Sequence, residues 1–200
     1  MSYDLVVVGV SWGGLRALSR LLDALPAEVD LPFVVAQHRA VEADAEQLAG
    51  LLQPHTHLRI GEPGDKDPIE RGHLYLAPPD YHLLVERGSF ALSVDAPVQY
   101  ARPSVDVLFE SVADAYGPRS IGIVLTGANA DGAEGLAAIK RAGGIAVVQD
   151  PRTAEARQMP DAALRATPAD AILPLEEIGP FLFGLDCSPA GVLVASEERP

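Results

Sequence analysis

The chain has 200 residues, enough for one domain with a sizeable core, and its hydrophobic content of 48% and charged content of 22% are typical of a soluble globular protein. The net charge of −13 disfavours nucleic acid or an anionic membrane as a partner, because their phosphate groups would be repelled. The single cysteine, Cys187, excludes a disulfide framework or a cysteine metal site, and no apolar run is long enough for membrane insertion. No secretory signal pattern opens the chain, so we expect a cytoplasmic protein.

The first half of the chain alternates between patterns typical of buried strands and patterns typical of helices. Leu5 to Val10 is a short aliphatic run that predicts a strand buried on both faces, and residues 15–22 have helical periodicity. The next predicted elements are a strand at 31–38, a helix at 43–52, a loop at 61–71 and a strand at 74–77. Two further strands, at 81–85 and 90–94, flank a short polar turn and predict a β-hairpin.

The second half continues the alternation. Ser104 is a good N-cap residue, with Asp106 in the first turn of the helix that it begins. The later predicted elements are strands at 120–126, 144–149 and 169–173 and helices at 133–141, 161–165 and 176–185. Residues 187–200 are predicted to be a loose tail, so the domain is expected to cover residues 1–186.

This alternation predicts an α/β fold. We expect a doubly wound, mostly parallel sheet with helices on both faces and the antiparallel β-hairpin at one edge. Functional residues of such folds collect at the carboxyl ends of the strands, near the point where strand order reverses. Polar groups follow three predicted strands: Ser11, His38 and the loop that contains Asn129 and Asp131.

Ser11 lies in a Gly-x-Ser-x-Gly motif between a strand and a helix, which is the setting in which that motif places a nucleophile. A glycine turn at this point is also how phosphate and dinucleotide sites are built. Trp12 argues against phosphate binding, because a bulky side chain stands where phosphate-binding loops usually carry glycine. By itself, the motif leaves a nucleophile, a phosphate site and a plain structural turn open.

Ser11, His38 and Asp131 together supply the groups for nucleophilic catalysis. A serine hydroxyl needs a base to take its proton, a neutral imidazole suits that task, and a buried carboxylate can fix the imidazole tautomer. The order Ser, His, Asp differs from the Ser, Asp/Glu, His order of α/β-hydrolases and argues against that fold. Each residue also has a simpler interpretation: His38 can be a satisfied histidine at a strand end, and Asp131 can be a helix N-cap.

The remaining histidines are weaker candidates. His55 and His57 could share one face of a strand as metal ligands, but no third ligand stands out, and solvated side chains are the simpler interpretation. His82 opens the hairpin and is a weaker candidate base. We therefore expect no metal site, and acyl transfer by a serine nucleophile needs no organic cofactor.

Several segments together resemble the catalytic domain of the chemotaxis protein-glutamate methylesterases, the CheB family. The segments follow the family order over about residues 4–186. They are Gly9-Val10-Ser11-Trp12-Gly13-Gly14-Leu15-Arg16-Ala17-Leu18, Gln37-His38, Leu76-Ala77-Pro78, Tyr81-His82, Arg102-Pro103-Ser104-Val105-Asp106-Val107-Leu108-Phe109, residues 125–136, Gln149-Asp150-Pro151 and Met159-Pro160.

The resemblance implies a Ser11/His38/Asp131 triad that hydrolyses glutamate γ-methyl esters on chemoreceptor helices, or on another methylated protein, and releases methanol. It also implies deamidation of receptor glutamine as a second activity. Candidates for the oxyanion hole and substrate contacts are Trp12, Ala128, Arg102 and Met159, the first two through their backbone N–H groups. Arg16, Arg39 and Arg102 are candidates for a positive rim, with solvated surface arginines as the simpler interpretation.

The chain departs from the family pattern in three ways. It begins at the catalytic strand, so we expect no control by a receiver domain in the same chain. Trp12 stands where the family usually has a small or hydroxyl residue, and Ala128-Asn129-Ala130 replaces a usual Met-Gly-Asn type of run. Two other functions therefore stay open: a catalytically weak relative that serves as a protein-binding module, and a serine hydrolase of small esters.

Overall fold

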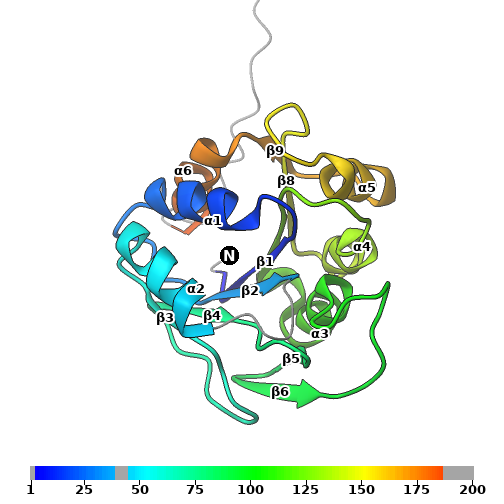
Figure 1. The fold of residues 1–200 in the computed structure, drawn as a ribbon. Coiled ribbons are helices and arrows are strands. Elements are labelled where there is room, and N and C mark those ends of the chain that lie inside the picture. Colours follow the sequence, from blue (N-terminus) through cyan, green and yellow to red (C-terminus); the bar gives the residue numbers. More distant parts are fainter. Residues whose placement is uncertain (1–2, 39–44, 187–200) are drawn as a thin grey trace, which may run out of the picture.

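The computed structural model describes residues 3–38 and 45–186 (Figure 1). Seven strands form one sheet in the order β3-β4-β2-β1-β7-β8-β9, and every neighbouring pair is parallel. The strands are β1 (Leu5–Val10), β2 (Phe33–Gln37), β3 (Arg59–Gly61), β4 (His73–Leu76), β7 (Ser120–Val124), β8 (Ile145–Gln149) and β9 (Ala171–Leu173). The chain leaves β1 toward β2 and later returns to its other side at β7, so the strand order reverses beside β1. This confirms the predicted doubly wound, parallel sheet.

Helices cover both faces of this sheet (Figure 1). One face packs α1 (Gly14–Asp23), α2 (Ala45–Leu52) and α6 (Leu175–Asp186), and the other packs α3 (Val105–Tyr116), α4 (Ala133–Arg141) and α5 (Gln158–Ala166). Two short 3₁₀ helices, η1 (Gln53–His55) and η2 (Gly117–Arg119), follow α2 and α3. No helix in the described part of the chain is both long and apolar enough to cross a membrane.

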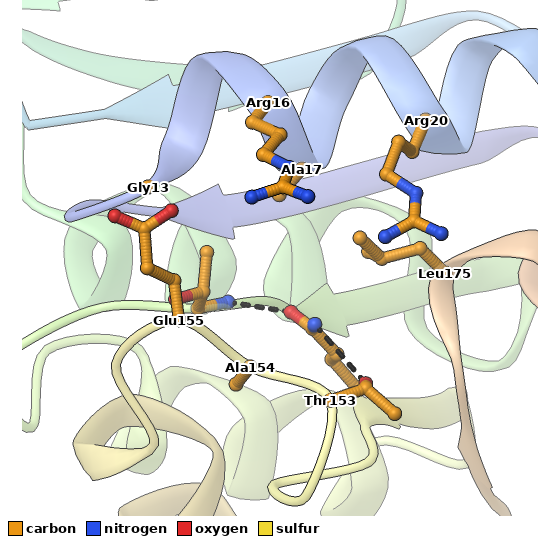
Figure 2. Close-up of a pocket in the computed structure, with 10 residues that line it drawn as sticks. Gly13, Arg16, Ala17, Arg20, Thr153, Ala154, Glu155 and Leu175 are labelled. Carbon is orange, nitrogen blue, oxygen red and sulfur yellow. Dashed lines mark hydrogen bonds between the residues drawn. The ribbon is translucent and has the colours of Figure 1, made fainter.

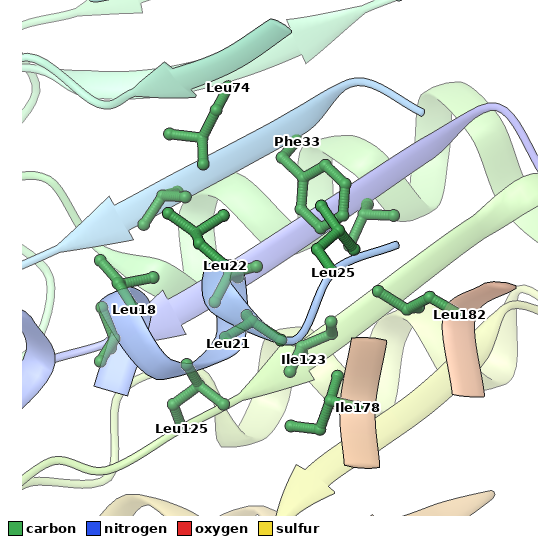
Figure 3. Packing of buried hydrophobic residues seen from close by; sticks show 14 of the residues in the cluster. Leu18, Leu21, Leu22, Leu25, Phe33, Leu74, Ile123, Leu125, Ile178 and Leu182 are labelled. Atoms are coloured by element: carbon green, nitrogen blue, oxygen red, sulfur yellow. The ribbon is translucent and has the colours of Figure 1, made fainter. Parts of the chain in front are cut away.

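The aliphatic run of β1 is explained by two hydrophobic cores, one on each face. Val6, Val8 and Val10 enter the core beneath α1 and α6, whereas Leu5 and Val7 enter the core beneath α3 and α4. Figure 3 shows the first core, where leucines of α1 meet residues of the central strands and of α6. Because alternate side chains of a strand point to opposite faces, a strand covered on both sides must be apolar at every position. The core thereby fixes β1, and with it the serine that follows.

The predicted hairpin is present as β5 (His82–Glu86) and β6 (Ser89–Ser93), but not at an edge of the large sheet. It forms a separate two-stranded sheet that lies against α3, where Leu83, Val85 and Phe90 are buried in the second core. The Val85 N–H also donates to the Ser111 hydroxyl of α3 (2.9 Å). The hairpin therefore buries its apolar face on a helix, and β3 and β9 are the edges of the large sheet.

Other departures from the sequence prediction are small. The edge strand β3 was not predicted, because three residues of mixed exposure are too short to show a period. The first turn of α5 begins at Gln158 instead of Asp161. The predicted tail at 187–200 lies outside the described residues.

Candidate active site

A tight turn after β1 presents Ser11 at the carboxyl edge of the sheet. The Ser11 N–H donates to the Thr126 carbonyl (3.0 Å), and the Ser11 carbonyl accepts from Gly14 N–H (2.9 Å). Gly13 has a φ of 76°, in the left-handed region that favours glycine, and α1 begins directly after it. The strand, turn and helix that the Gly-x-Ser-x-Gly motif requires are therefore all present.

The structure brings Ser11, His38 and Asp131 together. His38 Nδ1 lies 3.1 Å from Ser11 Oγ, and His38 Nε2 lies 2.7 Å from Asp131 Oδ2. A carboxylate can only accept, so these partners assign the imidazole proton to Nε2 and leave the Nδ1 lone pair facing the serine hydroxyl. Ser11 and His38 are half-buried and Asp131 is fully buried. The three residues follow β1, β2 and β7, which are adjacent strands.

Asp131 is held by the N-terminus of α3. Its carboxylate accepts from Ser104 Oγ (2.9 Å), Val105 N–H (2.8 Å) and Asp106 N–H (2.9 Å), in addition to His38. Burial raises the pKa of the Asp131 carboxyl, but the hydrogen bonds from His38 and the two backbone N–H groups outweigh it and hold the pKa below its ordinary value. Asp131 is therefore ionised at neutral pH and aimed at the imidazole. It caps a helix as well, but that helix is α3, not the helix that follows it in the chain.

A second buried carboxylate, Asp106, adjoins this network and was not predicted as a site residue. It accepts from the N–H groups of Gly132 and Gly135 (both 2.8 Å) and from Gln99 Nε2 (2.9 Å). Burial raises the pKa of Asp106 to about 6, and the nearby negative charge of Asp131 adds to the shift. Its position in the first turn of α3 could be predicted, but its partners on α4 could not.

Asn129 also contacts the imidazole and was not named as a site residue. Its Nδ2 atom lies 3.1 Å from His38 Nδ1, and its Oδ1 atom accepts from Asp131 N–H at 3.2 Å. The sequence indicated this loop and Asp131 as the partner of His38, but not that a second side chain of the loop would reach the imidazole.

The other predicted contacts fall into two groups. Trp12 is 66% exposed beside Ser11, and within the described residues neither its N–H nor that of Ala128 has a hydrogen-bond partner. Met159, by contrast, is 1% exposed and packs beneath Gly127. The Arg102 guanidinium pairs with Asp80 and donates to the carbonyls that follow β6. Met159 and Arg102 thus support loops at the site, whereas Trp12 and Ala128 present unpaired N–H groups.

The remaining histidines have structural partners. His82 is 1% exposed; its Nδ1 accepts from Ser104 N–H (3.2 Å) and its Nε2 donates to the Ala96 carbonyl (3.1 Å). His55 pairs with Asp23, and His57 donates to the Val29 carbonyl. Within the described ranges, no group of three potential metal ligands is found.

Two hollows flank the start of α1. A cavity of about 170 Å³ lies between α1 and the loop after β8 (Figure 2); Glu155 of that loop lies at its Gly13 end, and Arg20 of α1 lies at its Leu175 end. A wider groove of about 730 Å³ runs from Ser11 along α1 to His55. Arg16 borders both hollows and has no ion-pair partner in the described part of the chain, whereas Arg20 pairs with Glu176. Arg39 lies outside the described residues.

A serine, a histidine and a buried aspartate in this arrangement on a doubly wound α/β sheet are typical of serine hydrolases. A family model described as CheB methylesterase matches residues 6–182. The crystal structure of the Thermotoga maritima CheB methylesterase catalytic domain superposes with a TM-score of 0.86 at 31% identity, covering 92% of this chain and 100% of that one. The chain belongs to the CheB methylesterase family, which is a family of carboxylic-ester hydrolases.

Curated relatives agree with this assignment. A protein of Leptospira interrogans is 44% identical over 187 residues, which cover 93% of this chain and 96% of the relative. A Caulobacter vibrioides protein named protein-glutamate methylesterase/protein-glutamine glutaminase 2 is 39% identical over 90% of this chain. The match spans 53% of the Caulobacter protein, about half its length.

Proposed function

We propose that this chain hydrolyses glutamate γ-methyl esters on chemoreceptor helices, or on another methylated protein, to glutamate and methanol. Glutamine deamidation on the same proteins is its second activity. The observation that supports this proposal most directly is the chain of hydrogen bonds from Ser11 through His38 to the buried Asp131. The protein belongs to the CheB methylesterase family, which fits this chemistry.

The reaction begins at Ser11. His38 Nδ1 takes the hydroxyl proton while Oγ bonds to the ester carbonyl carbon, and the carbonyl π electrons move onto oxygen. Asp131 stabilises the imidazolium that forms, because its carboxylate is fixed by three further hydrogen bonds and does not have to reorganise. His38 then returns the proton to the departing methoxy oxygen, and methanol leaves. Water, activated by the same imidazole, hydrolyses the acyl-enzyme.

The unpaired N–H groups of Trp12 and Ala128 are the proposed oxyanion donors. One such donor in a preorganised site contributes on the order of 3 kcal/mol to the stabilisation of the transition state. Arg16 gives the groove beside Ser11 a local positive charge, which suits an acidic protein substrate despite the overall charge of −13.

Two substrates test the proposal against the two alternatives. We expect methanol release from methyl-labelled chemoreceptor membranes together with hydrolysis of 4-nitrophenyl acetate. Hydrolysis of the small ester without methanol release, across several receptors, would indicate a small-ester hydrolase. Receptor binding with neither activity would indicate a protein-binding module.

A further inference from the structure

The Nδ1 atom of His38 faces two side chains, not one. Ser11 Oγ and Asn129 Nδ2 each lie 3.1 Å from it. The amide of Asn129 is oriented by its other end, where Oδ1 accepts the N–H of Asp131. An amide nitrogen can only donate, so Asn129 aims a hydrogen-bond donor at the atom that receives the serine proton.

The Nδ1 atom of His38 cannot accept a hydrogen bond from both of these donors at once. A neutral imidazole with its proton on Nε2 has one lone pair at Nδ1, so the Ser11 hydroxyl and the Asn129 amide compete for it. Proton transfer from Ser11 ends the competition, because Nδ1 then carries a proton and becomes a donor itself. At that moment the Asn129 amide loses its partner, and the acyl oxygen of the substrate gains a negative charge.

We propose that Asn129 is a further catalytic residue, whose side-chain amide passes its hydrogen bond from His38 Nδ1 to the acyl oxygen as the tetrahedral intermediate forms. The inference rests on the proposed function. In this step the bond from Oγ to the carbonyl carbon forms, the proton moves from Oγ to Nδ1, and the carbonyl π electrons move to oxygen. Asn129 directly follows Ala128, so one loop would supply a backbone donor and a side-chain donor to the same oxygen.

Two variants separate this role from a structural one. Asn129→Ala removes the amide and also the acceptor for Asp131 N–H. Asn129→Ser keeps an acceptor for that N–H, because a serine hydroxyl can close the same turn, but it is too short to reach the imidazole. If Asn129 acts on the acyl oxygen, kcat for ester hydrolysis falls roughly 100-fold in both variants, with KM changed less than about threefold. If only Asn129→Ala loses activity, the residue serves the turn, and the proposal is overturned.

A measurement without turnover keeps this inference separate from the proposed function. Phenylboronic acid forms a tetrahedral adduct with a reactive serine and imitates the intermediate. We expect the wild type to bind it about 100-fold more tightly than Asn129→Ser does. Equal binding overturns the role of Asn129. Failure of the wild type to hydrolyse any ester refutes the proposed function instead, while the boronate comparison still decides the role of the amide.

Discussion

Asp106 and Asp131 cap each other's helices. Asp131, directly before α4, accepts from Val105 N–H and Asp106 N–H at the start of α3. Asp106, in the first turn of α3, accepts from Gly132 N–H and Gly135 N–H at the start of α4. Helix N-termini stabilise negative charge, so each helix end accommodates a buried carboxylate that would otherwise be costly. The Asp131 carboxylate is thereby held by the main chain of α3, and Asp106 ties the start of α4 to the same helix.

The first prediction concerns the pH dependence of stability. The pKa of Asp106 is raised to about 6 by burial, so between about pH 4 and pH 6 the native state binds a proton that the unfolded state lacks. The free energy of unfolding should rise as pH falls through this window, by up to about 3 kcal/mol. The pKa of Asp131 is lowered from its ordinary value of 3.8. Its effect on stability therefore falls below the pH window of Asp106, and there the free energy of unfolding decreases on acidification.

Urea unfolding between pH 4 and pH 8 checks this window. Asp106→Asn should abolish the rise, whereas Glu110→Gln, which removes an exposed charge one turn further along α3, should keep it. The same pH dependence in the wild type and Asp106→Asn would show that Asp106 is not its source.

The second prediction concerns the charge of Asp131. In Asp131→Asn one carboxylate oxygen becomes an NH₂ group that faces hydrogen-bond donors, and the fixed charge beside His38 is lost. We expect kcat to fall about 10⁴-fold and the free energy of unfolding to fall by about 1–3 kcal/mol. Ester kinetics and thermal unfolding measure the two effects. Retention of more than a tenth of the wild-type kcat would remove Asp131 from the proposed triad.

The third prediction concerns the packing beneath the site. A methyl group on Gly127 would overlap the Met159 sulfur and crowd the Ser11 side chain. Gly127→Ala should therefore lower stability by about 1–3 kcal/mol and lower kcat as well. Adding Met159→Ala makes room for the new methyl group and should restore part of the lost activity. A double variant no more active than Gly127→Ala would refute this account of the loop.

The fourth prediction concerns His82. In His82→Phe the buried Ser104 N–H loses its acceptor, and the free energy of unfolding should fall by about 1–3 kcal/mol. Because the His82 ring nitrogens bond to Ser104 and Ala96, kcat at 25 °C should stay within about threefold of the wild type. A loss of kcat comparable with that of His38→Ala, in folded protein, would make His82 the base.

The candidate site was largely predictable because of one geometric rule. Ser11, His38 and Asp131 follow three buried strands, and the carboxyl ends of parallel strands meet at one edge of a sheet. Asp106 and Asn129 were missed because their partners depend on the conformations of loops, which local patterns do not specify. The hairpin was predicted correctly, but its predicted place at an edge of the large sheet was wrong, because a hairpin with one apolar face can cover a helix as well as extend a sheet.

The most direct test of the central claim is methanol release from methyl-labelled chemoreceptor membranes, measured for the wild type, Ser11→Ala and Ser19→Ala. Ser19 lies in the second turn of α1 and borders the same groove, so its variant controls for changes in that groove. The account predicts release by the wild type and Ser19→Ala, and none above background with Ser11→Ala. Release by Ser11→Ala at the wild-type rate would contradict the role of Ser11 as the nucleophile.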